Sequence, residues 1–217
     1  MQQGNDLGLW CELGKPDRLA RPALFLDRDG VIIADTGYVG SAADLRMIDG
    51  VAAAIARCNA LQIPVVVVTN QSGIARGRYD WDGFCAVQAA LTAELAAAGA
   101  HLDGVVACAY HGEGLGALRV EAHPWRKPNP GMILAAADEM NLDLARSWIV
   151  GDKTSDLAAG AAAGLAGGTL LASSDQEGQQ ALALAAPRFL VELAAGPAEA
   201  LMGLIGSGRF AQAASTV

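Results

Sequence analysis

The chain has 217 residues, a hydrophobic fraction of 53% and a net charge of −8 from 15 basic and 23 acidic residues. This length suits one domain with a sizeable core, and the hydrophobicity excludes disorder for most of the chain. The acidic balance argues against a nucleic-acid partner, and no segment has the roughly 20 apolar residues of a membrane span. Its four cysteines form no C-x-x-C pair, so we expect a cytoplasmic protein without a membrane partner.

Short apolar runs alternate with helical patterns along the chain. Strands are expected at residues 23–26, 64–68, 105–110, 147–150 and 169–171, and helices at 51–61, 81–98, 132–140 and 155–163. This alternation predicts an α/β domain with a central parallel sheet and right-handed crossovers. We predict an N-terminal arm at 1–21, a catalytic core at 22–172, and a helical tail at 173–217 with an edge strand at 188–191. The tail is expected to pack on the core or to trail from it.

Two aspartates, Asp27 and Asp29, follow the first expected strand and are separated by one residue. In an open parallel sheet, sites lie at the carboxyl ends of the strands. One carboxylate there can act as a nucleophile while the other transfers protons. The alternative interpretation is structural, because aspartate is also a common turn former after a strand.

Three further segments bring polar groups to the same edge. Thr69-Asn70-Gln71-Ser72-Gly73 ends the second strand with groups suited to a phosphoryl oxygen, or simply makes a turn. Arg126-Lys127-Pro128 supplies two cations, although such a pair is more often a solvated turn. Gly151-Asp152-Lys153 ends a buried strand and offers Asp152 as a metal ligand. Two of the chain's three lysines, Lys127 and Lys153, therefore lie in these segments.

The order of these motifs resembles the haloacid dehalogenase (HAD) superfamily of phosphotransferases. Five segments of the sequence are similar to those of the heptose 1,7-bisphosphate phosphatase branch. They are Phe25-Leu26-Asp27-Arg28-Asp29-Gly30, Gly37-Tyr38-Val39, Thr69 to Gly77, Arg126-Lys127-Pro128 and Gly151-Asp152-Lys153. Histidinol-phosphate phosphatases are near relatives of that branch. The resemblance covers residues 23–171 and implies a three-layer Rossmann-like fold.

The resemblance also implies roles for individual residues. Asp27 would be the nucleophile that forms an aspartyl-phosphate, and Asp29 the acid and base. Thr69 and Lys127 would hold the phosphoryl oxygens, and Mg²⁺ would be bound by Asp27, the backbone carbonyl of Asp29, and Asp152. Asp156 is expected to support or cap rather than to bind the ion. The substrate side would be formed by Asp35, Thr36, Gly37, Tyr38, Asn70, Gln71, Ser72, Arg126 and Lys153.

Two features bear on the substrate. Only 39 residues separate Asp29 from Thr69, so no large cap domain fits, and the loop at 112–124 would be a partial cover. Relatives bind zinc through a C-x-H and a C-x-C pair, where this chain has Cys108-Ala109-Tyr110 and His123-Pro124-Trp125. Only Cys108 and His123 remain at ligand positions, with His111 one place out of register. Because closed zinc sites need four ligands, we expect no zinc; a residual site from these three residues is the alternative.

The sequence therefore predicts a Mg²⁺-dependent phosphatase that acts on a small phosphorylated sugar. The leading candidate reaction is removal of the 7-phosphate of heptose 1,7-bisphosphate. Histidinol phosphate or another small phosphomonoester is the alternative substrate. A non-catalytic phosphosugar-binding domain is a rival of another class, but it would have no reason to retain both Asp27 and Asp29. A DNA 3′-phosphatase conflicts with the acidic charge. We expect a monomer or a small homo-oligomer.

Overall fold

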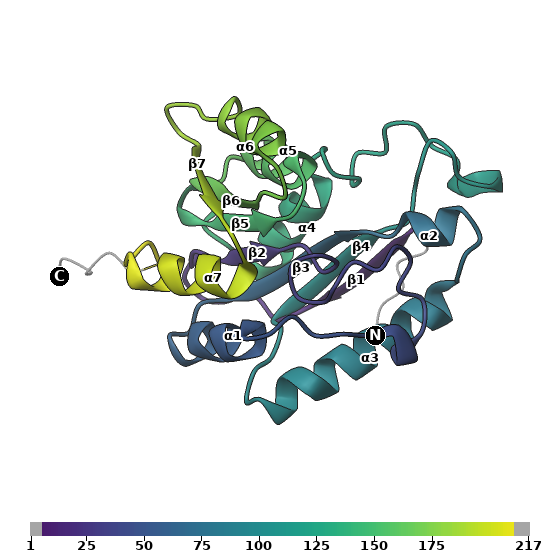
Figure 1. The fold of residues 1–217 in the computed structure, drawn as a ribbon, viewed down its shortest axis with the longest axis horizontal. Helices are drawn as coiled ribbons and strands as arrows, with labels where there is room; N and C mark the ends of the chain where they lie inside the picture. The colour runs from purple at the N-terminus through teal and green to yellow at the C-terminus, as the bar shows by residue number, and fades with distance from the viewer. Residues whose placement is uncertain (1–5, 211–217) are drawn as a thin grey trace.

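The computed structural model describes residues 6–210, which form one seven-stranded sheet with helices on both faces (Figure 1). The strand order is β1-β4-β3-β2-β5-β6-β7. The strands are β1 (Leu9–Leu13), β2 (Leu24–Leu26), β3 (Val65–Asn70), β4 (Gly104–Cys108), β5 (Trp148–Gly151), β6 (Gly167–Leu171) and β7 (Leu190–Ala194). All neighbouring pairs are parallel except β1 with β4.

The helices form the outer two of three layers (Figure 1). They are α1 (Val51–Ala60), α2 (Ser72–Ala75), α3 (Trp81–Ala97), α4 (Gly131–Met140), α5 (Thr154–Ala163), α6 (Asp175–Leu182) and α7 (Pro197–Gly206). The valines of β3 alternate between the two cores: Val65 and Val67 pack with α1, α3 and α7, and Val66 and Val68 with α4, α5 and α6. This is why the sequence shows a continuous apolar run there. The expected three-layer α/β fold is confirmed.

The arm predicted at 1–21 contains a strand that the sequence did not indicate. β1 pairs antiparallel with β4, with Leu9 opposite Cys108 and Leu13 opposite Gly104, so an antiparallel strand is added at the edge of the predicted central parallel sheet. A five-residue edge strand buries only part of its side chains, so it carries little periodic signal. The four-residue helix α2 also went unpredicted, because it is too short to show a helical period.

The tail predicted at 173–217 is partly sheet. It contributes α6, then β7, which extends the sheet in parallel beside β6, then α7, whose Leu201 and Leu204 are buried in the core. The edge strand runs over 190–194 rather than 188–191. Residues 1–5 of the arm and 211–217 of the tail lie outside the described residues, and the three-part division of the chain stays a prediction.

The segments between the sequence motifs are short. Asp29 and Thr69 are separated by loops, a 3₁₀ turn at Ala42–Asp44 and α1, and Thr69 and Lys127 by α2, α3, β4 and a 3₁₀ turn at Gly116–Leu118. Within residues 6–210 these segments form no separate cap domain, as the sequence predicted. No helix in that range is long and apolar enough to cross a membrane.

Candidate active site

The carboxyl ends of β2, β3 and β5 meet at one edge of the sheet and open into a cavity. Leu26 lies beside Val67 and Val150 in the parallel register, so the residues that follow leave the sheet together. The backbone N–H of Asp27 donates to the carbonyl of Val150 at 3.0 Å and fixes the first turn of that exit. The cavity has a volume of about 430 Å³ and is lined by Asp27, Asp29, Asp35, Gly37, Tyr38, Val39, Thr69, Asn70, Gln71, Ser72, Gly73, Tyr79, Arg126, Lys127, Pro128, Lys153, Ser155 and Asp156.

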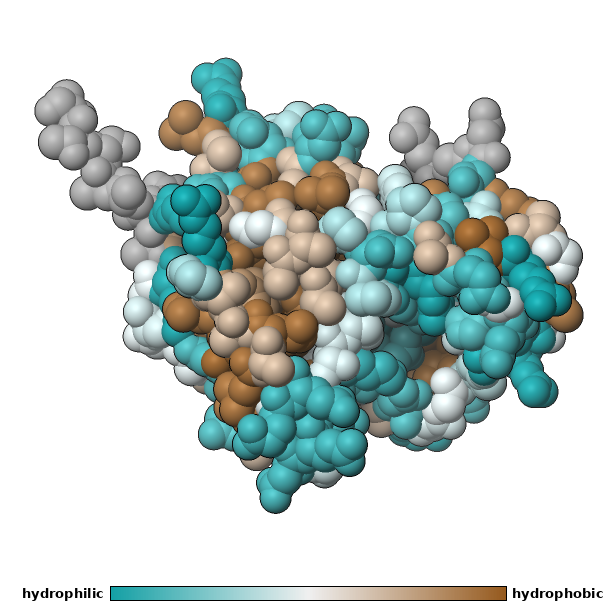
Figure 2. Space-filling view, turned by 90° about the horizontal axis from the view of Figure 1, so that it is seen from above, coloured by the Kyte–Doolittle hydropathy of each residue, from teal (hydrophilic) through white to brown (hydrophobic). Residues whose placement is uncertain are grey.

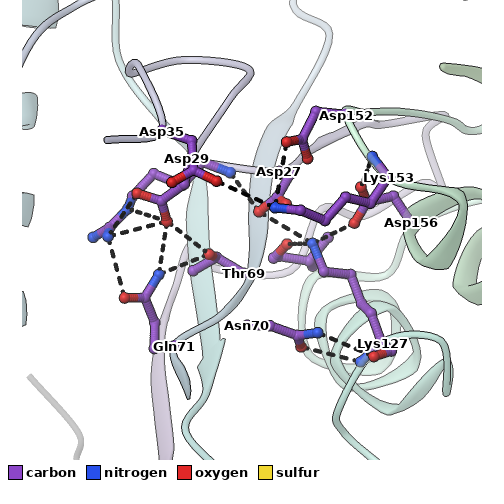
Figure 3. A network of polar contacts seen from close by, with 12 residues as sticks. Asp27, Asp29, Asp35, Thr69, Asn70, Gln71, Lys127, Asp152, Lys153 and Asp156 are labelled. Carbon is purple, nitrogen blue, oxygen red and sulfur yellow. Dashed lines mark hydrogen bonds and ion pairs between the residues drawn. The ribbon is translucent and has the colours of Figure 1, made fainter. Parts of the chain in front are cut away.

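Lys127 is a buried cation of this site (Figure 3). Its Nζ lies 3.1 Å from Asp27 Oδ1 and 2.6 Å from Asp156 Oδ1, and it donates to the carbonyl oxygen of Val68 at 2.7 Å. Burial disfavours the charged ammonium, but the carboxylates of Asp156 and Asp27 outweigh it, so the pKa of Lys127 is raised. A fixed positive charge thus lies directly beside the predicted nucleophile.

Asp27 is itself almost inaccessible, with 6% of its surface exposed. Burial raises the pKa of Asp27 to about 6; Lys127 acts against this rise, and Asp156 and Asp29 add to it. Its Oδ1 accepts from the backbone N–H of Arg28 at 2.7 Å. The carboxylate is therefore held in one orientation by a backbone donor and a buried ammonium.

Asp27, Asp152 and Asp156 form a compact acidic group, with one carboxylate oxygen of each lying within 4.8 Å of the others. Asp152 Oδ1 is buried and has no hydrogen-bond partner among the described residues. Burial, and then the charge of Asp27, raises the pKa of Asp152. By contrast, Asp156 is engaged through both oxygens, with Lys127 and with the backbone N–H of Lys153. The latter contact caps α5, as the sequence predicted for Asp156.

Most of the predicted substrate-side residues line the same cavity, and several of them are more exposed than Asp27 and Lys127. Lys153 Nζ bridges Asp35 and Asp152 at 3.3 Å each (Figure 3), and these carboxylates raise its pKa against the effect of burial. Asp35 Oδ1 accepts from the backbone N–H of Gly37 at 3.0 Å and closes a tight turn. Thr36, inside that turn, is exposed and does not line the cavity.

Asn70 and Gln71 line the cavity, but their amides are directed to protein groups. The Asn70 amide makes two hydrogen bonds to the backbone of Lys127, at 3.0 and 3.1 Å, and so ties the end of β3 to the segment that carries the lysine. The Gln71 side chain is 1% exposed and contacts Asp29 and Thr69. Neither amide projects into the cavity as a free group.

Two residues of the site were not singled out from the sequence. Arg28 is fully buried, donates to both oxygens of Asp29 at 3.3 and 3.2 Å, and lies over the ring of Phe84. Tyr79 lines the cavity and donates to Gln71 Oε1 at 2.5 Å. An arginine between two aspartates usually lies on a solvated loop, and Tyr79 precedes a helix outside every motif, so no local signal marked them.

The residues at the zinc-binding positions of relatives are not among those that line the cavity. Cys108 Sγ is 3.9 Å from His123 Nδ1, and His123 stacks on Tyr110 at a ring distance of 4.1 Å. His111 contacts Arg76 through Nε2 and accepts from the backbone N–H of Glu113 through Nδ1. The group of Asp27, Asp152 and Asp156 is the one cluster of three such ligand residues found within residues 6–210, and it excludes these histidines.

Residues 124–193 match the family model described as HAD-hydrolase-like. A protein from Mesorhizobium japonicum, named D-glycero-β-D-manno-heptose-1,7-bisphosphate 7-phosphatase, is 49% identical over 166 residues, which are 76% of this chain and 76% of that protein. The match therefore extends well beyond the segment covered by the family model.

Two solved structures are similar in three dimensions. A protein from Mesorhizobium loti described as a HAD-like phosphatase has a TM-score of 0.82 at 41% identity, covering 94% of this chain and 95% of that one. A D,D-heptose 1,7-bisphosphate phosphatase from B. bronchiseptica, crystallised with magnesium and phosphate, has a TM-score of 0.70 at 31% identity, covering 86% and 99%. The likeness thus spans the sheet and the cavity together.

Proposed function

Because the chain belongs to the heptose 1,7-bisphosphate phosphatase family of the HAD-like hydrolases, we propose that it removes the 7-phosphate of D-glycero-D-manno-heptose 1,7-bisphosphate. The observation that carries the proposal is the arrangement at Asp27. A buried carboxylate lies between the Lys127 ammonium and the unpartnered oxygen of Asp152, at the floor of a cavity open to small molecules. The proposed place of action is the cytoplasm, without a nucleic-acid or membrane partner.

The chain's own groups fit a divalent cation. Asp152 Oδ1 is buried without a partner and lies close to Asp27, which is an unfavourable arrangement of two carboxylates unless a cation binds there. We propose that Asp27, Asp152 and the backbone carbonyl of Asp29 hold Mg²⁺, and that Asp156, already engaged by Lys127, does not. When bound, the ion supplies positive charge that offsets the repulsion between Asp27 and a phosphate dianion.

The proposed chemistry proceeds in two displacements. A carboxylate oxygen of Asp27 attacks phosphorus, the bond from phosphorus to the sugar oxygen breaks, and Asp29 gives a proton to that leaving oxygen. Water then attacks the phosphorus of the aspartyl-phosphate, Asp29 takes its proton, and the bond to Asp27 breaks to release inorganic phosphate. We expect Lys127 and Thr69, which line the cavity, to hold the phosphoryl oxygens as negative charge develops on them.

The proposed substrate class follows from the shape and charge of the cavity. About 430 Å³ accommodates a phosphorylated sugar, and the lining offers Arg126, Lys153 and Asp35 to phosphate and hydroxyl groups. Arg126 is anchored by donating to the carbonyl of Tyr110 at 3.0 Å, so it is held in place at the rim. Histidinol phosphate is the second candidate substrate, because the groups proposed to bind the transferred phosphate would bind the phosphate of any small phosphomonoester.

The test is phosphate release from a panel with Mg²⁺: both anomers of heptose 1,7-bisphosphate, histidinol phosphate, and a 3′-phosphorylated oligonucleotide. We expect kcat/KM for one heptose anomer to exceed that for the other panel members by at least about tenfold, which corresponds to one or two additional polar contacts. Preferred turnover of histidinol phosphate or of the oligonucleotide would refute the substrate, and no turnover at all would refute the activity.

Gly30→Ala is expected to weaken the use of Mg²⁺. Gly30 has φ +82°, and a Cβ there would lie 2.5 Å from Asp152 Oδ2, so an alanine must displace that carboxylate from its present position. We expect the Mg²⁺ concentration for half-maximal activity to rise by about tenfold, roughly the effect of one displaced supporting contact. Steady-state rates over a Mg²⁺ titration measure it.

Gly99→Ala is the matched control for that variant. Gly99 also has a left-handed φ of +72°, but a Cβ there would meet nothing within 4 Å, so it carries backbone strain alone. Both variants should lose about 1 kcal/mol of stability, whereas only Gly30→Ala should change the Mg²⁺ requirement. Equal Mg²⁺ titrations for the two variants would contradict the placement of the ion.

We also propose that Cys108, His111 and His123 bind no zinc. Of the three residues available, His111 already uses both ring nitrogens in contacts with Arg76 and Glu113, and two ligands do not close a tetrahedral site. Elemental analysis of the purified protein decides this, and stoichiometric zinc would overturn it.

A further inference from the structure

One continuous polar network surrounds Asp29 and contains Arg28, Thr69, Gln71 and Tyr79. Figure 3 shows Asp29, Thr69 and Gln71 of this network. Arg28 donates to both oxygens of Asp29, and its Nη2 also reaches Gln71 Oε1 at 3.2 Å. The second donor to Gln71 Oε1 is the hydroxyl of Tyr79. On the other side of the same amide, Gln71 Nε2 donates to Asp29 Oδ2 at 2.9 Å and to Thr69 Oγ1 at 2.8 Å.

The donors in this network leave one orientation for the Gln71 amide. Arg28 has only N–H groups to offer, so the atom of Gln71 that faces it must be the oxygen. Burial raises the pKa of Tyr79 to about 12, which keeps its hydroxyl protonated and able to donate to the same oxygen. The amide nitrogen must then face Asp29 and Thr69, where both partners accept.

This orientation has a consequence for both groups that would meet the phosphate. Thr69 Oγ1 accepts from Gln71, so its own proton is left for Asp29 Oδ2, 3.5 Å away, or for an oxygen in the cavity. Asp29 receives three side-chain N–H donors on one side and therefore keeps its position relative to Asp27. Arg28 is 0% exposed and Gln71 is 1% exposed, so the hydrogen bond between these two side chains is shielded from solvent.

We propose that Gln71, fixed by Arg28 and Tyr79, is a positioning residue that acts on the reaction through Asp29 and Thr69 rather than by touching the substrate. This departs from the substrate-side assignment that the sequence suggested for Gln71. This inference rests on the proposed function, because the position of Asp29 affects a reaction only if the chain transfers a phosphoryl group. The mechanism requires such support, because misplacing an acid by about 1 Å costs on the order of 100-fold in rate.

The experiment is a double-mutant cycle between Gln71→Leu and Asp29→Asn, with p-nitrophenyl phosphate as substrate. In the wild-type background, Gln71→Leu should lower kcat by about 100-fold, and KM should fall with kcat because only the second displacement is slowed. In the Asp29→Asn background the same change should lower kcat by less than about threefold, because the group it positions has already been disabled.

A second readout separates positioning from general damage. The phenolate leaves without an acid, so a variant that lacks only a well-placed Asp29 still phosphorylates Asp27 but hydrolyses the intermediate slowly. Gln71→Leu should therefore show a burst of one p-nitrophenol per active site before slow turnover. Tyr79→Phe removes one hydroxyl and keeps the ring, so it should show the same pattern with a rate loss of roughly five- to tenfold.

Gln88→Leu is the matched control, since Gln88 is a buried glutamine of α3 outside the cavity. It should show no burst and little change in kcat. Equal effects of Gln71→Leu in both backgrounds, or a raised KM with unchanged kcat, would overturn the inference and return Gln71 to substrate binding. If the wild-type protein hydrolysed no phosphoester at all, the proposed function itself would be wrong. That outcome differs from the ones that would overturn only the role of Gln71.

Discussion

Asp27→Asn is expected to abolish turnover of every phosphoester while the protein stays folded. An amide has no anionic oxygen to attack phosphorus, and loss of an attacking group lowers kcat by at least about 10⁴-fold in enzymes of this kind. The fold should tolerate the change, because asparagine has the same size and Lys127 retains Asp156 and the Val68 carbonyl as partners. Phosphate release and thermal unfolding of the purified variant measure the two parts.

Asp35→Asn is the matched control for this loss. Asp35 is another cavity aspartate, but it lies at the rim and pairs with the exposed Lys153. We expect it to keep activity within about tenfold of the wild type, as fits one partly solvated contact. If both variants lost activity to the same extent, Asp27 would be one of several electrostatic contributors and not the nucleophile.

Lys127→Met should lower both stability and activity. Methionine fills a similar volume but leaves the buried carboxylates of Asp27 and Asp156 facing each other without a cation. Leaving a buried charge without its partner costs about 3–5 kcal/mol, and loss of a cation beside the transferring phosphoryl group lowers kcat by roughly 10³-fold. Chemical denaturation at pH 7.5 and steady-state kinetics measure the two effects.

The stability loss should depend on pH. A carboxylate whose folded-state pKa is raised destabilises the fold fully above that pKa, and the effect vanishes below the unfolded-state value. The pKa of Asp27 is already raised to about 6 by burial, with Lys127 acting against the rise, so removing Lys127 raises it further. The deficit of Lys127→Met should therefore be smaller at pH 4–5 than at pH 7.5.

Two variants separate this explanation from simple loss of packing. Lys153→Met removes a lysine that is 57% exposed, so it should change stability by less than about 1 kcal/mol. Adding Asp156→Asn to Lys127→Met removes one of the two opposed charges and should restore much of the lost stability. If Lys127→Met lost less than about 1 kcal/mol, or if the double variant gained nothing, the buried charge cluster would not stabilise the fold as described.

The sequence indicated the location of the site because parallel strands bring their carboxyl ends together. Asp27 and Asp152 each follow a short, fully buried strand, and Thr69 lies near the end of another apolar strand, so the pattern is readable without a structure. Lys127 required the family resemblance, since nothing in an Arg-Lys-Pro turn indicates that the lysine is 3% exposed. Its buried partners, Asp156 of α5 and the carbonyl of Val68 in β3, come from distant parts of the chain, so its burial is a tertiary property.

The residues that hold the site's side chains in place could not be predicted from the sequence pattern. Arg28 is buried only because Phe84 of α3, 56 positions further along the chain, lies under its guanidinium. The polar amide of Gln71 is typical of a substrate-binding residue, but hydrogen bonds from Arg28 and Tyr79 direct this amide toward the protein. The edge strand β1 was missed for a related reason, because its stability comes from pairing with β4 and not from its own periodicity.

The most direct test of the account is to find where the phosphoryl group resides during turnover. The Asp29→Asn variant should accumulate the intermediate from p-nitrophenyl phosphate, since the first step then needs no acid while the second lacks its base. Rapid quenching, borohydride reduction of the acyl phosphate and peptide mass spectrometry identify the modified position. The account predicts conversion of Asp27 to homoserine; reduction at another residue, or an unmodified Asp27 in a variant that has released p-nitrophenol, would contradict it.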